Sequence, residues 1–187
     1  MKKLRLLGVA AATLLATAAQ AAVLSLSPAT VNAAPGQTTG WGFSLLNDDT
    51  ANFLLVTGTE FSLAPPSAFG SYADLLASPP SFVVLAPLAH LSESYDATLG
   101  TGIGQFSLAP SAQGSLSGQI QLHYALFSVD PNSAGFDPDL HLVNPDATAF
   151  ASASVGAVPE PSTWSLFGAA GLLVAAWRRR ALSRSTA

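Results

Sequence analysis

The sequence contains no cysteine, and between Ala22 and Ala157 it contains no lysine or arginine either. Without cysteine no disulfide can stabilise the fold, and attachment of a lipid to an N-terminal cysteine is excluded. Without cations this segment cannot neutralise phosphates, so nucleic-acid binding and nucleotide chemistry are excluded. Its stability must therefore come from apolar burial and backbone hydrogen bonds, because no Lys or Arg ion pair can form there.

The charges are divided sharply along the chain. All seven Lys and Arg residues lie before residue 6 or after residue 177, in a chain whose net charge is −4. The 136 residues from Ala22 to Ala157 instead carry ten acidic side chains: Asp48, Asp49, Glu60, Asp74, Glu93, Asp96, Asp130, Asp137, Asp139 and Asp146. We expect a wholly acidic segment of this kind to be soluble, to repel anionic polymers and to attract divalent cations.

The N-terminus has the pattern of a secretory signal peptide. A basic start is followed by the apolar run Leu6–Ala19. Ala19 and Ala21 are small residues at the two positions that signal peptidase inspects, so the cut is expected between Ala21 and Ala22. Residues 1–21 are therefore predicted to form a signal helix that exports the chain and is removed by signal peptidase.

The last thirty residues, 158–187, are the most informative part of the sequence. Val158 is followed by Pro159, Glu160 and Pro161. Proline fixes its own φ and disfavours helical angles at the residue before it, so this motif must be extended. An extended, unpaired segment is the form in which a processing enzyme can bind a peptide as an added strand.

A transmembrane helix is predicted over residues 162–177, which carry no charge and are rich in Leu, Ala and Gly. As a helix this run spans roughly 24 Å, slightly less than the ~30 Å hydrocarbon core of a bilayer. A buried helix of a soluble domain is the alternative, but the basic tail 178–187 favours lipid. Its arginine cluster marks the cytoplasmic side by the positive-inside rule: Arg178, Arg179 and Arg180.

This order of a Pro-Glu-Pro motif, an apolar helix and a basic cluster resembles the PEP-CTERM sorting signal of bacteria that secrete exopolysaccharide. The resemblance does not extend into residues 22–157. It implies that an exosortase, an integral-membrane cysteine protease or transpeptidase, cuts the chain near Pro159–Pro161. It also implies an exported protein that is anchored transiently in the inner membrane and then reaches the cell surface or the extracellular matrix.

Residues 22–157 are predicted to form one all-β domain. Short runs of alternating apolar residues are interrupted by Gly, Pro, Ser or Asn, and no long amphipathic helix pattern appears. About seven or eight antiparallel strands indicate a two-sheet antiparallel β-sandwich of immunoglobulin-like or jelly-roll type. This sandwich would be flanked by the N-terminal signal helix and the C-terminal transmembrane helix.

Four local expectations follow from the pattern. Residues 39–46 should be a strand with Trp41 on its core face, and they should form a hairpin with residues 52–59. Residues 60–80 should cross between sheets and hold a helical turn at 72–77. The strongest strand is 115–129, in which one face is polar up to His123 and then becomes apolar, as at a bulge.

The sequence offers little support for catalysis. His90, His123 and His141 lie on separate segments without metal-ligand spacing, and no G-x-S-x-G motif is present. A hydrolase with two paired carboxylates is left open as a hypothesis. The absence of Lys and Arg disfavours it, and we predict a protein that is not an enzyme and needs no cofactor.

One acidic segment has oxygen ligands of the kind that calcium prefers: Asp130, Asn132, Asp137 and Asp139. It is not an EF-hand, because Ala134 and His141 occupy ligand positions. A looser calcium site competes with a solvated turn in which Asp and Asn side chains bind the backbone.

The sequence therefore favours a non-catalytic surface or matrix protein. The alternative hypothesis is a module of the exopolysaccharide matrix that binds calcium, polysaccharide or both.

Overall fold

The protein is described by a computed structural model, which covers residues 21–62, 68–76 and 82–158. Most of the expected signal peptide and nearly all of the expected sorting tail, including the predicted transmembrane helix 162–177, lie outside these residues. Within the described part of the chain, no helix has the length and apolar character needed to cross a membrane.

The described residues form ten strands and one short helix. In chain order these are β1 (Ala22–Ser27), β2 (Thr30–Ala33), β3 (Thr38–Asn47), β4 (Phe53–Phe61), β5 (Gly70–Asp74), β6 (Val84–Leu85), β7 (His90–Glu93), β8 (Gly104–Leu108), β9 (Gly114–Phe127), α1 (Pro138–His141) and β10 (Leu142–Ala157).

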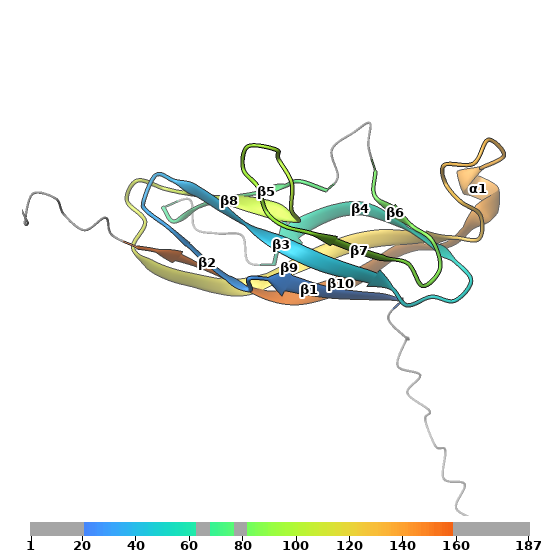
Figure 1. Cartoon of the computed structure of the whole chain (residues 1–187), viewed down its shortest axis with the longest axis horizontal. Helices are drawn as coiled ribbons and strands as arrows, with labels where there is room; N and C mark the ends of the chain where they lie inside the picture. The colour runs from blue at the N-terminus through green and yellow to red at the C-terminus, as the bar shows by residue number, and fades with distance from the viewer. Residues whose placement is uncertain (1–20, 63–67, 77–81, 159–187) are drawn as a thin grey trace, which may run out of the picture.

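The strands build two stacked sheets (Figure 1). The first has the order β1-β3-β8-β5, with β7 also pairing with β3, and the second has the order β2-β10-β9-β4-β6. All pairs are antiparallel except β2 with β10, which run parallel. The first sheet follows the A-B-E-D order of an immunoglobulin-like sandwich, and β10-β9-β4 follows G-F-C. The predicted two-sheet sandwich is confirmed, with this strand order rather than that of a jelly roll.

The core lies between the two sheets and follows the predicted alternation. Trp41 is fully buried on β3, together with Phe43 and Leu45. On β9, Ile120, Leu122 and Tyr124 face the same core with exposed fractions of 0, 0 and 2%. The second face of β9 also becomes buried at Ala125 and Phe127, as expected. Register irregularities lie in both neighbouring strands, between Val56 and Gly58 of β4 and between Leu142 and Ala147 of β10.

The predicted hairpin between β3 and β4 is wrong, because the two strands belong to different sheets. The connection is an arch held by two polar side chains. Asn47 is fully buried, and its side-chain amide donates to three backbone carbonyls: Asn52, Leu85 and Ala86. Asp49 accepts the backbone N–H groups of two residues further along the same arch: Ala51 and Asn52. These bonds satisfy backbone N–H and C=O groups of the arch and of the segment beside it. In a hairpin, the two strands would satisfy such groups by pairing with each other.

The predicted helical turn at 72–77 is also wrong over its described part, since β5 extends through Tyr72 to Asp74 and pairs with β8. The ring of Tyr72 packs against the core. In a strand, alternate side chains point to opposite faces, so Tyr72 points inward while Ser71 and Ala73 point outward. Asp74 then ends the strand by accepting the N–H of Leu76. The predicted crossover is confirmed, because β4 and β5 lie in different sheets. The sequence analysis missed the two short strands β2 and β7.

Candidate functional site

The outer face of the second sheet carries a row of mostly polar side chains, here called the polar face. It is formed by alternate residues of β9 and their register partners on β10: Ser117, Gln119, Gln121, His123, Thr148, Phe150, Ser152 and Ser154. Phe150 is the one large apolar side chain in this set and is 47% exposed, directly opposite Gln121. The predicted polar side of β9 is therefore confirmed as a solvated surface.

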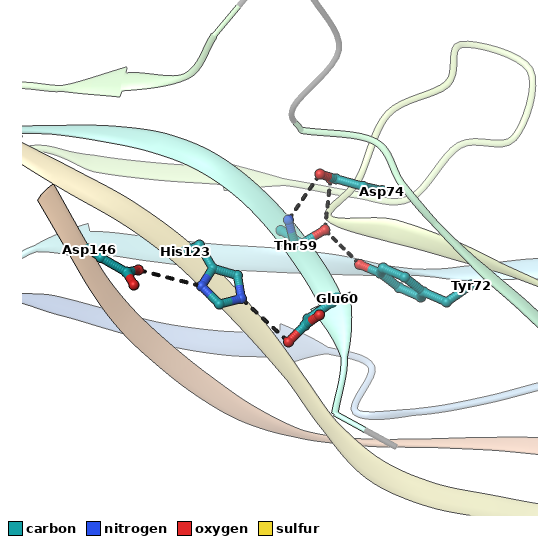
Figure 2. A network of polar contacts seen from close by, with 6 residues as sticks. All are labelled: Thr59, Glu60, Tyr72, Asp74, His123 and Asp146. Carbon is teal, nitrogen blue, oxygen red and sulfur yellow. Dashed lines mark hydrogen bonds and ion pairs between the residues drawn. The ribbon is translucent and has the colours of Figure 1, made fainter. Parts of the chain in front are cut away.

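His123 lies on this face between two carboxylates that come from neighbouring strands (Figure 2). Its Nε2 is 3.5 Å from Glu60 Oε1 on β4, and its Nδ1 is 3.9 Å from Asp146 Oδ1 on β10. All three side chains are at least one-third exposed. At these distances the contacts are too long for hydrogen bonds and are ion pairs only when His123 carries a proton on both nitrogens, and exposed pairs of this kind contribute little to stability.

A second polar group lies between the sheets and links them (Figure 2). Thr59 of β4 donates its backbone N–H to Asp74 Oδ2 at 2.9 Å and its hydroxyl to Asp74 Oδ1 at 2.7 Å. The Tyr72 hydroxyl lies 2.8 Å from the same Thr59 oxygen. Thr59 is buried, and most of the Tyr72 side chain is buried beside it. This burial raises the pKa of Tyr72 above its ordinary value. This group is a structural cross-link between the two sheets, because its hydrogen-bonding atoms bind one another.

The other two histidines lie elsewhere, so the three do not converge. His90 Nε2 is 2.7 Å from the Ser44 hydroxyl on the first sheet. His141, at the end of α1, accepts the backbone N–H of Asp137 at its Nδ1. Among residues 21–62, 68–76 and 82–158, no group of three or more His, Asp or Glu side chains is placed to hold a metal ion.

The candidate calcium residues bind the backbone of their own loop. Asp130 Oδ1 accepts the N–H of Asn132 at 2.8 Å. Asp137 caps the N-terminus of α1 by accepting the N–H of Asp139 at 3.0 Å. These contacts are those of the solvated-turn interpretation, in which Asp side chains replace missing backbone partners.

The two expected processing sites lie next to the start and the end of the described fold. Ala21 is partly buried, and Ala22 begins β1. At the other terminus β10 ends at Ala157, and the N–H of Val158 donates to the Ala33 carbonyl at 2.9 Å. Ala19 and the sorting residues from Pro159 onward lie outside the described residues. The sandwich therefore continues, without a linker, to the residue before the Pro-Glu-Pro motif.

Comparison with protein families gives a match at this junction. The family model of the PEP-CTERM protein-sorting motif matches residues 157–180. The chain carries a PEP-CTERM sorting motif. This motif implies processing by an exosortase-type system, and hence a protein that is exported, anchored in a membrane and then cleaved. The match confirms that the tail resembles this sorting signal. Apart from its last residue, Ala157, the sandwich lies outside the matched residues.

The sandwich was also compared with known proteins. A search of curated protein sequences gave no match. Among solved structures, a PapD-like domain of human CEP192 has a TM-score of 0.39 at 10% identity, covering 81% of this chain and 98% of that one. The WR4 protein of C. elegans, an MSP family member, has a TM-score of 0.35 at 10% identity, covering 75% and 100%. A type I cohesin–dockerin complex from Clostridium thermocellum has a TM-score of 0.27 at 12% identity, covering 76% and 97%. Likeness at this level carries no argument about function.

The sequence analysis missed the grouping of His123 with Glu60 and Asp146. The alternation of β9 placed His123 on the solvated face, but the two carboxylates lie far from it in the sequence. Only strand pairing, with Glu60 opposite Gln121 and Thr148 opposite His123, brings the three segments together. Finding this group from the sequence would have required a prediction of the strand order.

Proposed function

We propose that this protein is a non-catalytic β-sandwich that an exosortase-type system delivers to the cell surface or the extracellular matrix. The observation that carries the proposal is the direct passage from the last strand of the sandwich into the PEP-CTERM motif at Ala157. The whole folded domain thus lies on the N-terminal side of the motif. Cleavage at Pro159–Pro161 would release it intact.

The order of events follows from the two termini. Signal peptidase removes residues 1–21, and the predicted transmembrane segment 162–177 then holds the precursor in the inner membrane with Arg178–Arg180 on the cytoplasmic side. The exosortase cuts the extended motif and separates the sandwich from its anchor. The domain suits the space outside the cell because it contains no cysteine that oxidation could alter.

The non-catalytic assignment is supported by the way the polar groups are used. The buried group of Thr59, Tyr72 and Asp74 is occupied by its own hydrogen bonds. The exposed group around His123 lies on the solvated face of a sheet, whereas small-molecule sites are usually concave.

Processing is tested by replacing the motif residues. We expect Glu160→Ala, or Gln in place of Arg178, Arg179 and Arg180, to leave full-length precursor in the inner membrane of the native host. Glu93→Ala is the matched control, because it removes a carboxylate from the sandwich and leaves the motif unchanged. Immunoblots of membrane and medium, with the mass of the mature C-terminus, give the result. Release of mature protein at the normal rate from the Glu160→Ala variant would contradict the proposal.

Binding of polysaccharide is a second candidate function, favoured by one observation on the polar face. Phe150 is 47% exposed among amide and hydroxyl side chains, an arrangement in which an aromatic ring can stack on a sugar while its neighbours bind hydroxyl groups. Phe150→Ala should then reduce retention of the mature protein in gels that contain the host exopolysaccharide. Leu99→Ala, which removes an exposed apolar side chain from the connection between β7 and β8, is the control. Equal retention of both variants and the parent would remove this candidate.

The calcium part of the alternative hypothesis has a separate test. A thermal unfolding midpoint that rises at millimolar calcium, and no longer rises after Asp130→Asn with Asp137→Asn, would support a site in the loop before α1. An unmoved midpoint would remove calcium from the hypothesis.

A further inference from the structure

The two ends of the sandwich differ in charge. The exit end, where the chain leaves toward the sorting motif, consists of connections 34–37 and 109–113 with Ala157 and Val158. The opposite end, here called the far end, consists of connections 48–52 and 128–141. In Figure 1 the exit end lies at the left and α1 marks the far end at the right. The strand register supports this division, since Gly114 pairs with Ala157 and Phe127 pairs with Leu142.

The exit end carries no charged side chain, although the domain contains ten carboxylates. Five of these lie in the far-end connections: Asp48, Asp49, Asp130, Asp137 and Asp139. The others lie along the body of the sandwich: Glu60, Asp74, Glu93, Asp96 and Asp146. On β5, Asp74 lies four residues after Gly70, which pairs with Leu108 at the exit end. At about 3.3 Å per residue, even this carboxylate is therefore about 13 Å from the end of its strand.

The exit end is also hollowed and largely apolar. A groove of about 550 Å³ is lined by residues that include Pro35, Pro110, Ala112 and Ala157. Beside it, Val158 is 51% exposed although its N–H is bonded to Ala33. The lining carries no charge, and Gln113 is its one long side chain.

The sequence places this end close to the membrane before cleavage. Val158 is held on the sandwich, and only five residues lie between it and Trp164, where the apolar run begins. The six Cα-to-Cα steps from Val158 to Trp164 span at most about 22 Å when fully extended. The 14 residues of β9 alone span about 45 Å, so the exit end is always nearer to the anchor than the far end.

We propose that, in the uncleaved precursor, the exit end is a membrane-facing surface whose groove rests on the head groups of an anionic phospholipid bilayer. This inference depends on the anchoring described under the proposed function. The short tether holds the surface at high local concentration, so even a weak contact is populated. The carboxylates set the orientation, because bringing them to an anionic surface is opposed by repulsion, whereas the uncharged exit end meets no such barrier.

The experiment uses two single-cysteine variants. Because the natural chain has no cysteine, a thiol-reactive label attaches only at the introduced residue. Ser111→Cys labels the exit end, and Ser133→Cys is the matched control at the far end, since both serines are exposed loop residues. The uncleaved precursor is purified from an export-competent host without an exosortase. It is then labelled with a fluorophore and reconstituted into vesicles of phosphatidylcholine and phosphatidylglycerol whose head groups carry a quencher.

We expect the label at Ser111 to lose most of its emission and the label at Ser133 to retain most of it. Equal quenching of the two labels, or stronger quenching at Ser133, would overturn the orientation. Alkaline extraction of the same vesicles tests the anchor separately. Extraction of the chain would overturn the proposed anchoring and this orientation with it, whereas equal quenching in a chain that resists extraction overturns the orientation alone.

A charge variant tests the electrostatic reason. Gln37→Glu with Gln113→Glu adds two carboxylates to the exit end, and should restore emission of the Ser111 label in vesicles with phosphatidylglycerol but not in pure phosphatidylcholine. The matched control, Gln119→Glu with Gln121→Glu, adds the same charge to the polar face and should leave the quenching unchanged. Quenching that responds equally to both pairs would overturn the assignment of the exit end as the lipid-facing surface.

Discussion

The hydrogen-bonded link between the two sheets allows a quantitative prediction. Thr59→Val keeps the shape of the side chain but removes the hydroxyl that contacts Asp74 Oδ1 at 2.7 Å and Tyr72 at 2.8 Å. A bond to a charged partner contributes about 1.5–3 kcal/mol, and leaving a buried partner unsatisfied costs about 1–3 kcal/mol. Asp74 still accepts two backbone N–H groups and Tyr72 still lies 3.4 Å from the Ile103 carbonyl, so the lower part of these ranges applies.

We therefore expect Thr59→Val to lower the free energy of unfolding of the mature protein by about 1.5–2 kcal/mol. For a domain of this size, that corresponds to a midpoint lower by about 4–8 °C. Urea unfolding followed by the fluorescence of Trp41 measures the effect, since Trp41 is the only tryptophan before the sorting tail and is fully buried. Thr57→Val on the same strand is exposed and should change stability by less than about 0.5 kcal/mol.

A double-mutant cycle tests whether the link is the cause. Tyr72→Phe removes the other end of the contact to Thr59, so the two substitutions together should cost less than the sum of the single costs, by about 1 kcal/mol. Additive costs, or a Thr59→Val variant no less stable than Thr57→Val, would refute the reasoning that these bonds hold the sheets together.

Two further predictions concern pH and packing. Burial raises the pKa of both Tyr72 and Tyr124 in the folded state, so ionisation favours unfolding. Stability should be unaffected by these groups below pH ~10 and fall as the pH rises above it, and Tyr72→Phe should lessen the fall seen in alkaline unfolding curves. Gly40→Ala would place a methyl group against the Tyr95 ring and 2.6 Å from the Gly104 carbonyl, and should cost more than about 2 kcal/mol in urea unfolding. Gly135→Ala meets no atom within 4 Å and should be nearly neutral; equal costs would contradict this packing argument.

Much of the sandwich could be predicted because strand alternation is a local property. The core positions of β3 and the two faces of β9 follow from which residues are apolar at every second position. The pairing of strands could not be predicted in the same way. The arch after Asn47 looks like a hairpin turn in sequence, and its true nature depends on carbonyls at Leu85 and Ala86. The group around His123 is likewise assembled from β4, β9 and β10.

The sorting motif and the apolar face of each main strand can be predicted without knowledge of the fold. A sorting motif acts as a short extended segment whose residues are neighbours in the chain, so its chemistry is present before any folding. Which strands pair and which polar groups meet is seen only in the folded domain, whose described residues next to the motif include no carboxylate. These features depend on contacts between residues far apart in the chain, and such contacts form only when two sheets close over a common core.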